Sequence, residues 1–129
     1  MIKLESLDHL VLTVRSIPAS IDFYSHILGM DVITFDEGRK ALRFDQQKIN
    51  LHEYGRSFEP CAKHPFPGSA DLCFITQQPI DAVMDALRQS GVTQIDGPIH
   101  RTGAIGQLVS IYIRDPDGNL IEIANNLNL

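Results

Sequence analysis

The chain has 129 residues, 43% of them hydrophobic, and a formal net charge of -5 at pH 7. A chain of this length normally folds as one domain and needs no disulfide or structural metal to do so. Because the net charge is negative and no basic stripe is present, we expect no nucleic-acid partner. Cys61 and Cys73 form no Cys-x-x-Cys pair, and the chain has no run of about 18 apolar residues that would span a membrane. We therefore expect a soluble, cytoplasmic protein with reduced thiols.

The first half of the chain predicts a strand, a helix and three further strands. The first strand opens at His9, and Ser16 then caps a helix that contains Pro18 in its first turn, where a proline loses no hydrogen bond. Gly29 ends this helix, because glycine readily adopts the left-handed conformation. Short β-rich runs between turn-forming residues predict strands at 32–35, 41–44 and 49–54.

The second half repeats this plan, which indicates an internal duplication. Asp71 opens a short apolar strand, Pro79 begins a helix and Gly91 ends it, with the same spacing from strand to glycine as in the first half. Further strands are expected near 92–95, 108–114 and 120–124. The prediction is a single domain over 1–129, made of a first module at 1–55, a linker at 56–70 that holds three prolines and a glycine, and a second module at 71–129.

Another irregular segment, residues 97–106, holds three glycines just before an apolar run. A glycine-rich segment of this kind is typical of a mobile flap beside a cleft, so we predict a lid here. Arg101 lies in this segment, and its guanidinium suits an anionic substrate, although a solvated loop arginine is the competing interpretation.

Successive residues of a strand point to opposite sides of a sheet, so each strand divides into two rows. In the last strand, Ile121 and Ile123 form an apolar row and Glu122 lies opposite. Helices that cover the apolar rows leave the other face free to form a pocket. The polar side chains predicted on that face are His9, His52, Tyr54, Asp71, Ser110, Tyr112, Arg114 and Glu122. A carboxylate such as Glu122 is costly to bury unless it is paired, hydrogen-bonded or bound to a metal.

The stretches LDHLVLTV, DFYSHILGM, DLCFIT and above all RDPDGNLIE at 114–122 resemble the vicinal oxygen chelate superfamily, most closely its short glyoxalase-domain-containing group. The resemblance covers nearly the whole chain. It implies an α+β fold of two tandem βαβββ modules, with the sheet curled around a metal or ligand cleft, and often a homodimer. The superfamily includes glyoxalases, thiol transferases, extradiol dioxygenases and bleomycin-binding proteins that perform no chemistry.

The resemblance also implies a divalent-metal site whose ligands map onto His9, Asp71 and Glu122. Asn50 stands where a fourth ligand is a glutamate in glyoxalases, and His52, two residues on, is a substitute ligand in an alternative arrangement. One nitrogen and two oxygen ligands suit Fe, Mn, Ni or Zn, and magnesium stays open. The alternative to metal binding is a structural hydrogen bond for His9, an ion pair with Arg114 or another basic group for Glu122, and a cap at the start of its strand for Asp71. For His52 the alternative is to support a metal ligand or to contact the substrate.

Two functions follow from these residues. In the first, the protein is a metal-dependent enzyme that acts on a small oxygen-rich substrate by lyase or isomerase chemistry, then in order of preference by dioxygenation or thiol transfer. Glu122 or His52 would move a proton, and the side chains expected to contact substrate are His52, Tyr54, Arg101 and Tyr112. In the second, the protein sequesters a small molecule without a metal. His26, His64 and His100 are expected at the surface.

Overall fold

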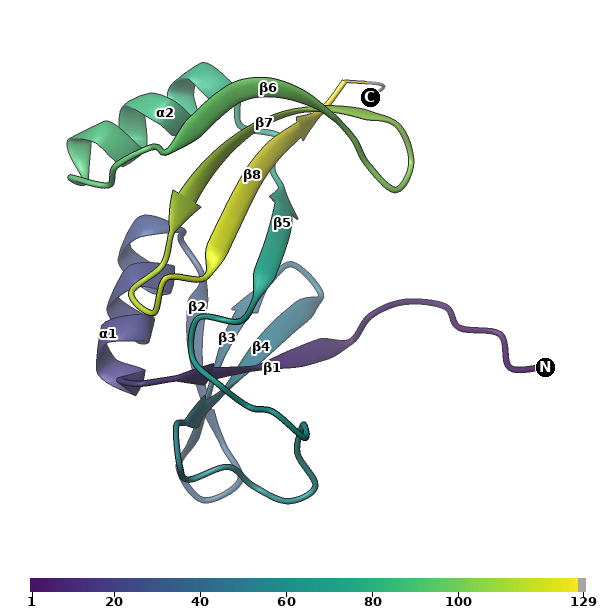
Figure 1. Ribbon diagram of the computed structural model, residues 1–129, viewed down its shortest axis with the longest axis vertical. Coiled ribbons are helices and arrows are strands. Elements are labelled where there is room, and N and C mark those ends of the chain that lie inside the picture. Colours follow the sequence, from purple (N-terminus) through teal and green to yellow (C-terminus); the bar gives the residue numbers. More distant parts are fainter. Residues whose placement is uncertain (128–129) are drawn as a thin grey trace. The chain divides into compact units, whose positions relative to one another are not determined.

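The computed structural model describes residues 1–127, in two units that comprise Met1–Pro67 and the chain from Gly68 onward. Each unit is a four-stranded sheet with one helical segment (Figure 1). The first unit contains β1 (His9–Val14), α1 (Ile17–Asp22), the π-helical turn η1 (Phe23–Ile27), β2 (Asp31–Phe35), β3 (Arg39–Phe44) and β4 (Gln47–Glu53). The second contains β5 (Asp71–Ile75), α2 (Ile80–Gln89), β6 (Asp96–Thr102), β7 (Gln107–Arg114) and β8 (Leu120–Asn126).

The two sheets have the same topology, with strand orders β1-β4-β3-β2 and β5-β8-β7-β6. In each sheet the first strand pairs in parallel with the last, and the other neighbours are antiparallel. The predicted fold class of two βαβββ modules is therefore confirmed. The single domain over 1–129 and its linker at 56–70 stay predictions.

The helices begin and end at the residues that the sequence indicates. Ser16 Oγ accepts a hydrogen bond from Ala19 N at 3.2 Å, and Pro18 lies in the first turn of α1. Pro79 is the N-cap residue of α2 but has no side chain that can cap, and the oxygen of Asn125 on β8 accepts from Ile80 N at 2.8 Å instead. Gly29, after η1, has the positive φ of 73° that suits a helix end.

The predictions for residues 92–106 are partly wrong. No strand forms at 92–95, because Val92 N donates to Leu87 O and stays with the end of α2. The predicted lid is instead strand β6 as far as Thr102, followed by a hairpin turn. Its glycine and proline are tolerated because β6 is an edge strand and its pairing with β7 shifts register between Asp96 and Ile99. His100 therefore lies on β6, exposed as expected.

The register confirms how the strand residues divide between faces. The apolar rows are buried with the helices, and these buried side chains include Leu12, Val14, Ile49 and Leu51 in the first unit and Ile111, Ile113, Ile121, Ile123, Val83 and Leu87 in the second. On the opposite faces, Val11 of β1 and Ile75 of β5 are exposed. Each unit thus keeps one sheet face for its core, whereas the other face is only partly accessible, since Asn50, His52 and Ser110 on it are buried.

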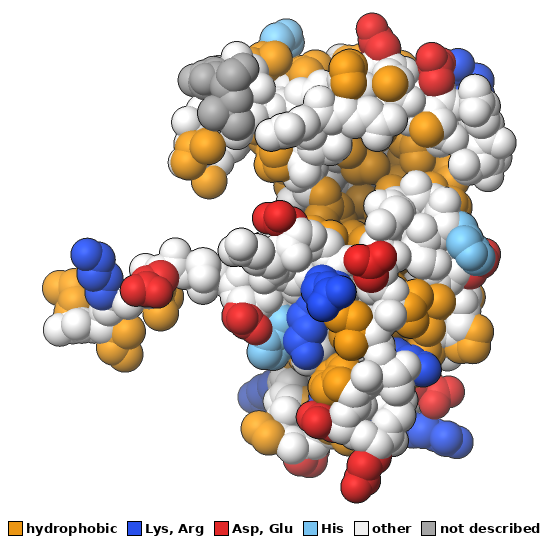
Figure 2. Space-filling view, turned by 180° about the vertical axis from the view of Figure 1, so that it is seen from behind, with side chains coloured by type: hydrophobic (Ala, Val, Ile, Leu, Met, Phe, Trp, Pro, Cys, Tyr) orange, Lys and Arg blue, Asp and Glu red, His pale blue; other side chains and the backbone are white. Residues whose placement is uncertain are grey.

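Residues 1–8 precede β1 as an exposed segment without regular structure, which projects from the first unit in Figures 1 and 2. The face shown in Figure 2 has acidic and basic side chains interspersed rather than gathered in one patch. Among residues 1–127, no helix is both long and apolar enough to cross a membrane.

Candidate functional site

The open face of the second unit brings together side chains from all four of its strands. The register places Cys73 of β5 beside Glu122 of β8, and Glu122 beside Tyr112 of β7. Paired residues of neighbouring strands project from the same side of a sheet, so these three side chains form a row across it. Asp96 of β6 pairs with Tyr112 at the end of this row. The row lies on the face opposite Ile121 and Ile123, as the sequence predicts.

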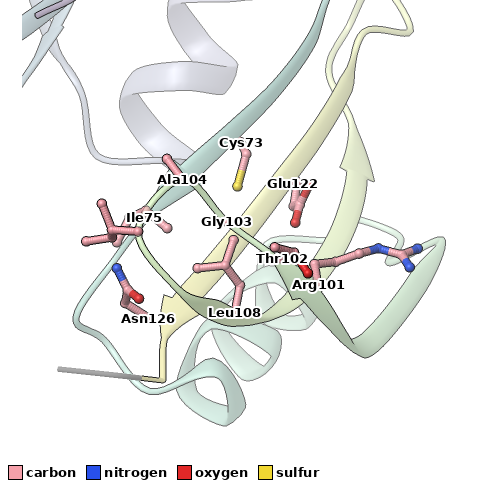
Figure 3. Close-up of a pocket in the computed structure, with 10 residues that line it drawn as sticks. Cys73, Ile75, Arg101, Thr102, Gly103, Ala104, Leu108, Glu122 and Asn126 are labelled. Carbon is pink, nitrogen blue, oxygen red and sulfur yellow. The ribbon is translucent and has the colours of Figure 1, made fainter.

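Two adjoining cavities lie on this face. One, of about 390 Å³, contains several charged side chains in its lining, which consists of Asp71, Ile95, Asp96, Arg101, Tyr112, Arg114, Leu120 and Glu122. The other, of about 480 Å³, is lined by Cys73, Ile75, residues 101–105 of β6 and its hairpin, Leu108, Glu122 and Asn126 (Figure 3). Because Arg101 and Glu122 line both cavities, the two together make one continuous site with a carboxylate and a guanidinium in its middle.

Arg101 is held at this site by a neighbouring strand. Its Nε donates to the Tyr112 hydroxyl at 2.8 Å, and its guanidinium carbon lies 5.6 Å from the centre of the Tyr112 ring. The hydrogen bond to Tyr112 is also the main cause that raises the pKa of Arg101, with smaller contributions from Asp96 and Glu122. Arg101 therefore keeps its charge, and it faces the cavity from a strand rather than from the mobile loop that the sequence indicated.

The turn before β8 fixes where Glu122 lies. Asp115 Oδ1 accepts hydrogen bonds from the backbone N–H groups of Asp117 and Asn119, both at 2.9 Å, and Asp115 Oδ2 accepts from Asn119 Nδ2 at 2.8 Å. Asn119 Oδ1 in turn accepts from Ala70 N, just before β5, at 2.8 Å. Since Asn119 links the start of β5 to the start of β8, it aligns Glu122 with Cys73. The motif RDPDGNLIE was identified from the sequence, but this role of its asparagine was not.

Cys73 is influenced strongly by this environment. Partial burial of its thiol is the main cause that raises its pKa to about 11, followed by the charge of Glu122, a hydrogen bond to Glu122 and the charge of Asp71. The thiol is therefore protonated at neutral pH and donates to the Glu122 carboxylate. The sequence analysis did not predict the pairing of Cys73 with Glu122.

We expect Glu122→Gln to increase the rate at which iodoacetamide alkylates Cys73. Thiolate is the reactive form, so a pKa near 11 leaves only ~0.1% of the thiol reactive at pH 8. Removing the carboxylate charge lowers the pKa, while the contribution of burial remains, so we expect a rate at pH 8 roughly 3- to 10-fold higher. The measurement is the pH profile of alkylation in chelator-treated protein with Cys61→Ser, since Cys61 is also exposed. An unchanged profile would show that Glu122 does not influence the thiol.

In the first unit, His9 opens β1 and is exposed. Its Nδ1 lies 2.8 Å from Asp8 Oδ2, with side chains 44% and 86% exposed, respectively. A carboxylate that holds Nδ1–H fixes the tautomer and leaves Nε2 available as an acceptor or metal ligand. This pairing of His9 with Asp8 was not predicted, although the Asp-His dipeptide is visible in the sequence.

His52 of β4 is in a different environment, being only 3% exposed. Its Nε2 lies 3.2 Å from Arg39 Nη2, and its ring packs edge-on against Phe58, with the ring centres 5.3 Å apart. The guanidinium carbon of Arg39 also lies 4.3 Å from the Phe58 ring centre and 5.0 Å from that of Phe35. Burial, and then the charge of Arg39, lower the pKa of His52. A neutral His52 therefore accepts a hydrogen bond from Arg39.

Other predicted residues of this face are spread along the strands. His52 pairs with Thr13, so it lies four positions from His9 along the parallel pair, roughly 13 Å at about 3.3 Å per residue. Such a spacing argues against His52 as a substitute ligand beside His9. Asn50 pairs with Val11, and is 6% exposed. Tyr54 is half exposed, with its ring centre 6.0 Å from that of Phe66.

The predicted site residues thus divide between the units. Asp71, Glu122, Arg101 and Tyr112 line one cavity of the second unit, whereas His9, His52 and Tyr54 belong to the first. Within residues 1–127, no three His, Cys, Asp or Glu side chains are grouped as a metal site. A metal site shared by His9, Asp71 and Glu122 stays a prediction. His26 and His64 are exposed, as expected.

Comparison with known proteins now gives the family. Residues 6–123 match the model of the Glyoxalase/Bleomycin resistance protein/Dioxygenase superfamily, and the chain belongs to this family. It is 55% identical to Virulence protein STM3117 of Salmonella typhimurium over 94% of this chain and 84% of that protein. It is also 50% identical to Glyoxalase domain-containing protein RDO1 of Mycosarcoma maydis, over 96% of this chain and 70% of that protein.

Solved structures agree with this assignment. The crystal structure of STM3117 superposes with a TM-score of 0.96 at 53% identity, covering 98% of this chain and 100% of that one. Two more distant structures share the fold alone. A lactoylglutathione lyase from Agrobacterium tumefaciens has a TM-score of 0.74 at 18% identity, covering 95% of both chains. TnmS3, an antibiotic-binding protein from Streptomyces sp. CB03234, has a TM-score of 0.75 at 21% identity, covering 98% of this chain and 99% of that one.

Proposed function

We propose that the protein is a metal-dependent enzyme that acts on a small, oxygen-rich substrate. His9 of the first unit and Asp71 and Glu122 of the second would hold a divalent cation, chosen from Fe, Mn, Ni and Zn, with magnesium as a further option. A cation held by these residues would supply Lewis-acid chemistry, which stabilises negative charge on the oxygens of a substrate.

The observation that supports this proposal best is the contact between His9 and Asp8. With Nδ1 held 2.8 Å from Asp8 Oδ2, the free Nε2 of an exposed histidine is ready to bind a cation. Asp71 and Glu122 add two carboxylates on an accessible face of the second unit, where they line the same cavity. Family membership adds that related proteins use this fold for small molecules.

The remaining side chains of the cavity suit the handling of an anionic substrate. Arg101, fixed by Tyr112, presents a permanent positive charge beside Glu122. A guanidinium there binds a carboxylate or enolate oxygen and orients the substrate. Glu122 is accessible, whereas His52 is enclosed and its Nε2 is engaged by Arg39. We therefore assign proton transfer to Glu122 rather than His52. Among the possible reactions we favour isomerase or lyase chemistry over dioxygenation, and dioxygenation over thiol transfer.

One observation favours the second candidate, sequestration of a small molecule without chemistry. Asn50 stands where a fourth, acidic ligand would contribute charge, and its buried Oδ1 has no hydrogen-bond partner among residues 1–127. A neutral amide binds a cation more weakly than a carboxylate does. The antibiotic-binding neighbour TnmS3 shows that the fold also serves binding proteins.

Metal analysis of the full chain, purified without chelator and then dialysed, tests the proposal. We expect a divalent metal to be retained, and His9→Ala and Glu122→Ala each to weaken its binding by at least about 100-fold, since even the loss of a supporting partner costs 10- to 100-fold. Asp8→Asn, which removes only the supporting partner of His9, should weaken metal binding by about 10- to 100-fold. The matched control is His26→Ala, because His26 is also exposed and also contacts a carboxylate, that of Asp22, but lies on a helix.

If the protein retains no metal after exposure to any of Mn, Fe(II), Ni, Zn and Mg, sequestration replaces catalysis as the function.

We further propose a homodimer, since β1, β2, β5 and β6 are edge strands in their own sheets and unpaired edges favour association. Light scattering tests this proposal, and a monomer at all micromolar concentrations would contradict it. A cytoplasmic location also stays a prediction, and the free thiols of Cys61 and Cys73 are consistent with it.

A further inference from the structure

One half of the open face in the second unit is apolar, unlike the half that holds Asp71 and Arg114. Ile75 is 52% exposed and Ile105 is 75% exposed, yet both line the same cavity of about 480 Å³. Leu108 and Ala104 complete its apolar lining. Large side chains that face water in a cavity gain stability when an apolar group covers them. This half of the face therefore favours a ligand with an apolar part.

The hairpin between β6 and β7 gives the cavity a defined wall. Gly103 N donates to Gly106 O at 2.7 Å, which closes the turn. A Cβ on Gly103 would lie only 2.9 Å from Leu108 Cγ and 3.0 Å from Gly106 O, so the hairpin lies directly against Leu108. In Figure 3, Gly103 and Ala104 of this segment lie near Cys73, Ile75 and Leu108. The cavity is thus bounded by strand side chains and by a closely packed turn.

Polar groups are placed at one end of this apolar cavity. Arg101 and Glu122 line it and also line the polar cavity that contains Asp71 and Tyr112. We infer that the ligand is amphiphilic. Its head has adjacent oxygen atoms that face Arg101 and Glu122, and its short aliphatic chain lies between Ile75, Leu108 and the hairpin. This inference rests on the proposed function for the role of the head, and names the substrate class of that same site.

A small molecule suits this cavity better than a protein surface does. Its volume lies in the range of about 300–1,000 Å³ that is typical of small-molecule sites. Charged groups adjoin it on one side, which matches a ligand with one polar end. A second copy of the chain that covered Ile75 and Ile105 is the competing explanation for these exposed side chains.

Binding of straight-chain hydroxamates with two to eight carbons, measured by calorimetry, tests the inference. Hydroxamates present two adjacent oxygens, and the series is measured on the full chain loaded with Mn²⁺ and again after chelator treatment. We expect affinity to rise about 4-fold for each methylene added, until the cavity is filled. The corresponding primary amides, which lack the second oxygen, should bind more weakly but show the same gain per methylene.

Ile105→Ser and Ile75→Ser provide the variants. Both side chains are exposed, so these changes should leave folding intact, and each should reduce the gain per methylene to less than about 2-fold. Val32→Ser is the matched control, because Val32 is an exposed apolar residue of the first unit, on β2. Its gain per methylene should equal that of the unchanged protein.

The outcomes separate this inference from the proposed function. If acetohydroxamate binds only with metal but longer chains bind no better, the aliphatic subsite is wrong and the metal proposal stands. If the gain per methylene persists in chelator-treated protein that never binds metal, the metal proposal is wrong and the subsite stands. A third outcome is that affinity does not change with hydroxamate chain length and that light scattering shows a dimer which Ile105→Ser dissociates. A second copy of the chain then covers Ile75 and Ile105, and the inference is overturned.

Discussion

Replacing Gly97 by alanine is expected to lower the free energy of unfolding by at least about 3 kcal/mol. Gly97 has a φ of 94°, which a residue with a side chain rarely adopts. An added Cβ would also lie 2.4 Å from Ser110 O and 2.9 Å from Ile111 Cα on β7. Both atoms belong to backbone in the middle of a sheet, so neither can move away without breaking strand pairing.

The effect should extend to the site, because Gly97 lies at the register shift that sets the position of β6. Displacing β6 would move Arg101 away from the Tyr112 hydroxyl. Urea unfolding of Gly97→Ala and Gly91→Ala gives the comparison. Gly91 has a similarly positive φ of 75° but open space around its Cα, so its substitution should cost only about 1–2 kcal/mol. Equal losses in the two variants would show that close approach to β7 does not matter.

The second large effect is expected from Asn119→Ala, with a loss of about 3 kcal/mol in the free energy of unfolding. Asn119 is fully buried, and its side chain bonds both Asp115 Oδ2 and Ala70 N, each at 2.8 Å. Alanine would remove one donor from a buried carboxylate and leave the amide of Ala70 without its acceptor. A buried donor without a partner costs more than the net value of the bond that it lost.

Gln89→Ala is the control for this variant, because Gln89 is an exposed polar residue in the same unit and should change stability by less than about 0.5 kcal/mol. The measurement is again urea unfolding. Cys73 alkylation adds a readout of position, since a shift of β8 against β5 would separate Cys73 from Glu122 and speed the reaction. A loss below about 1 kcal/mol for Asn119→Ala would contradict the role given to its hydrogen bonds.

The sequence by itself determined the modules and their faces. The recurring order of strand, proline-started helix and glycine predicted the βαβββ plan, and alternation along β8 placed Glu122 opposite Ile121 and Ile123. These properties are local: helix starts depend on a few neighbouring residues, and the alternation of side chains is a property of any extended strand. Resemblance of short motifs then indicated the family, which the comparisons confirm.

Only the tertiary structure decided which side chains of a face lie together. Cys73 and Glu122 are 49 residues apart in sequence, as are Ala70 and Asn119, whose bond aligns their strands. His52 has the same alternation as Asn50, but it is enclosed by Arg39 from another strand and by Phe58 from the following loop. Residues 97–102 form a strand because the edge of the sheet tolerates a glycine and a proline there. Register and enclosure depend on contacts between distant segments, and a local pattern contains no information about them.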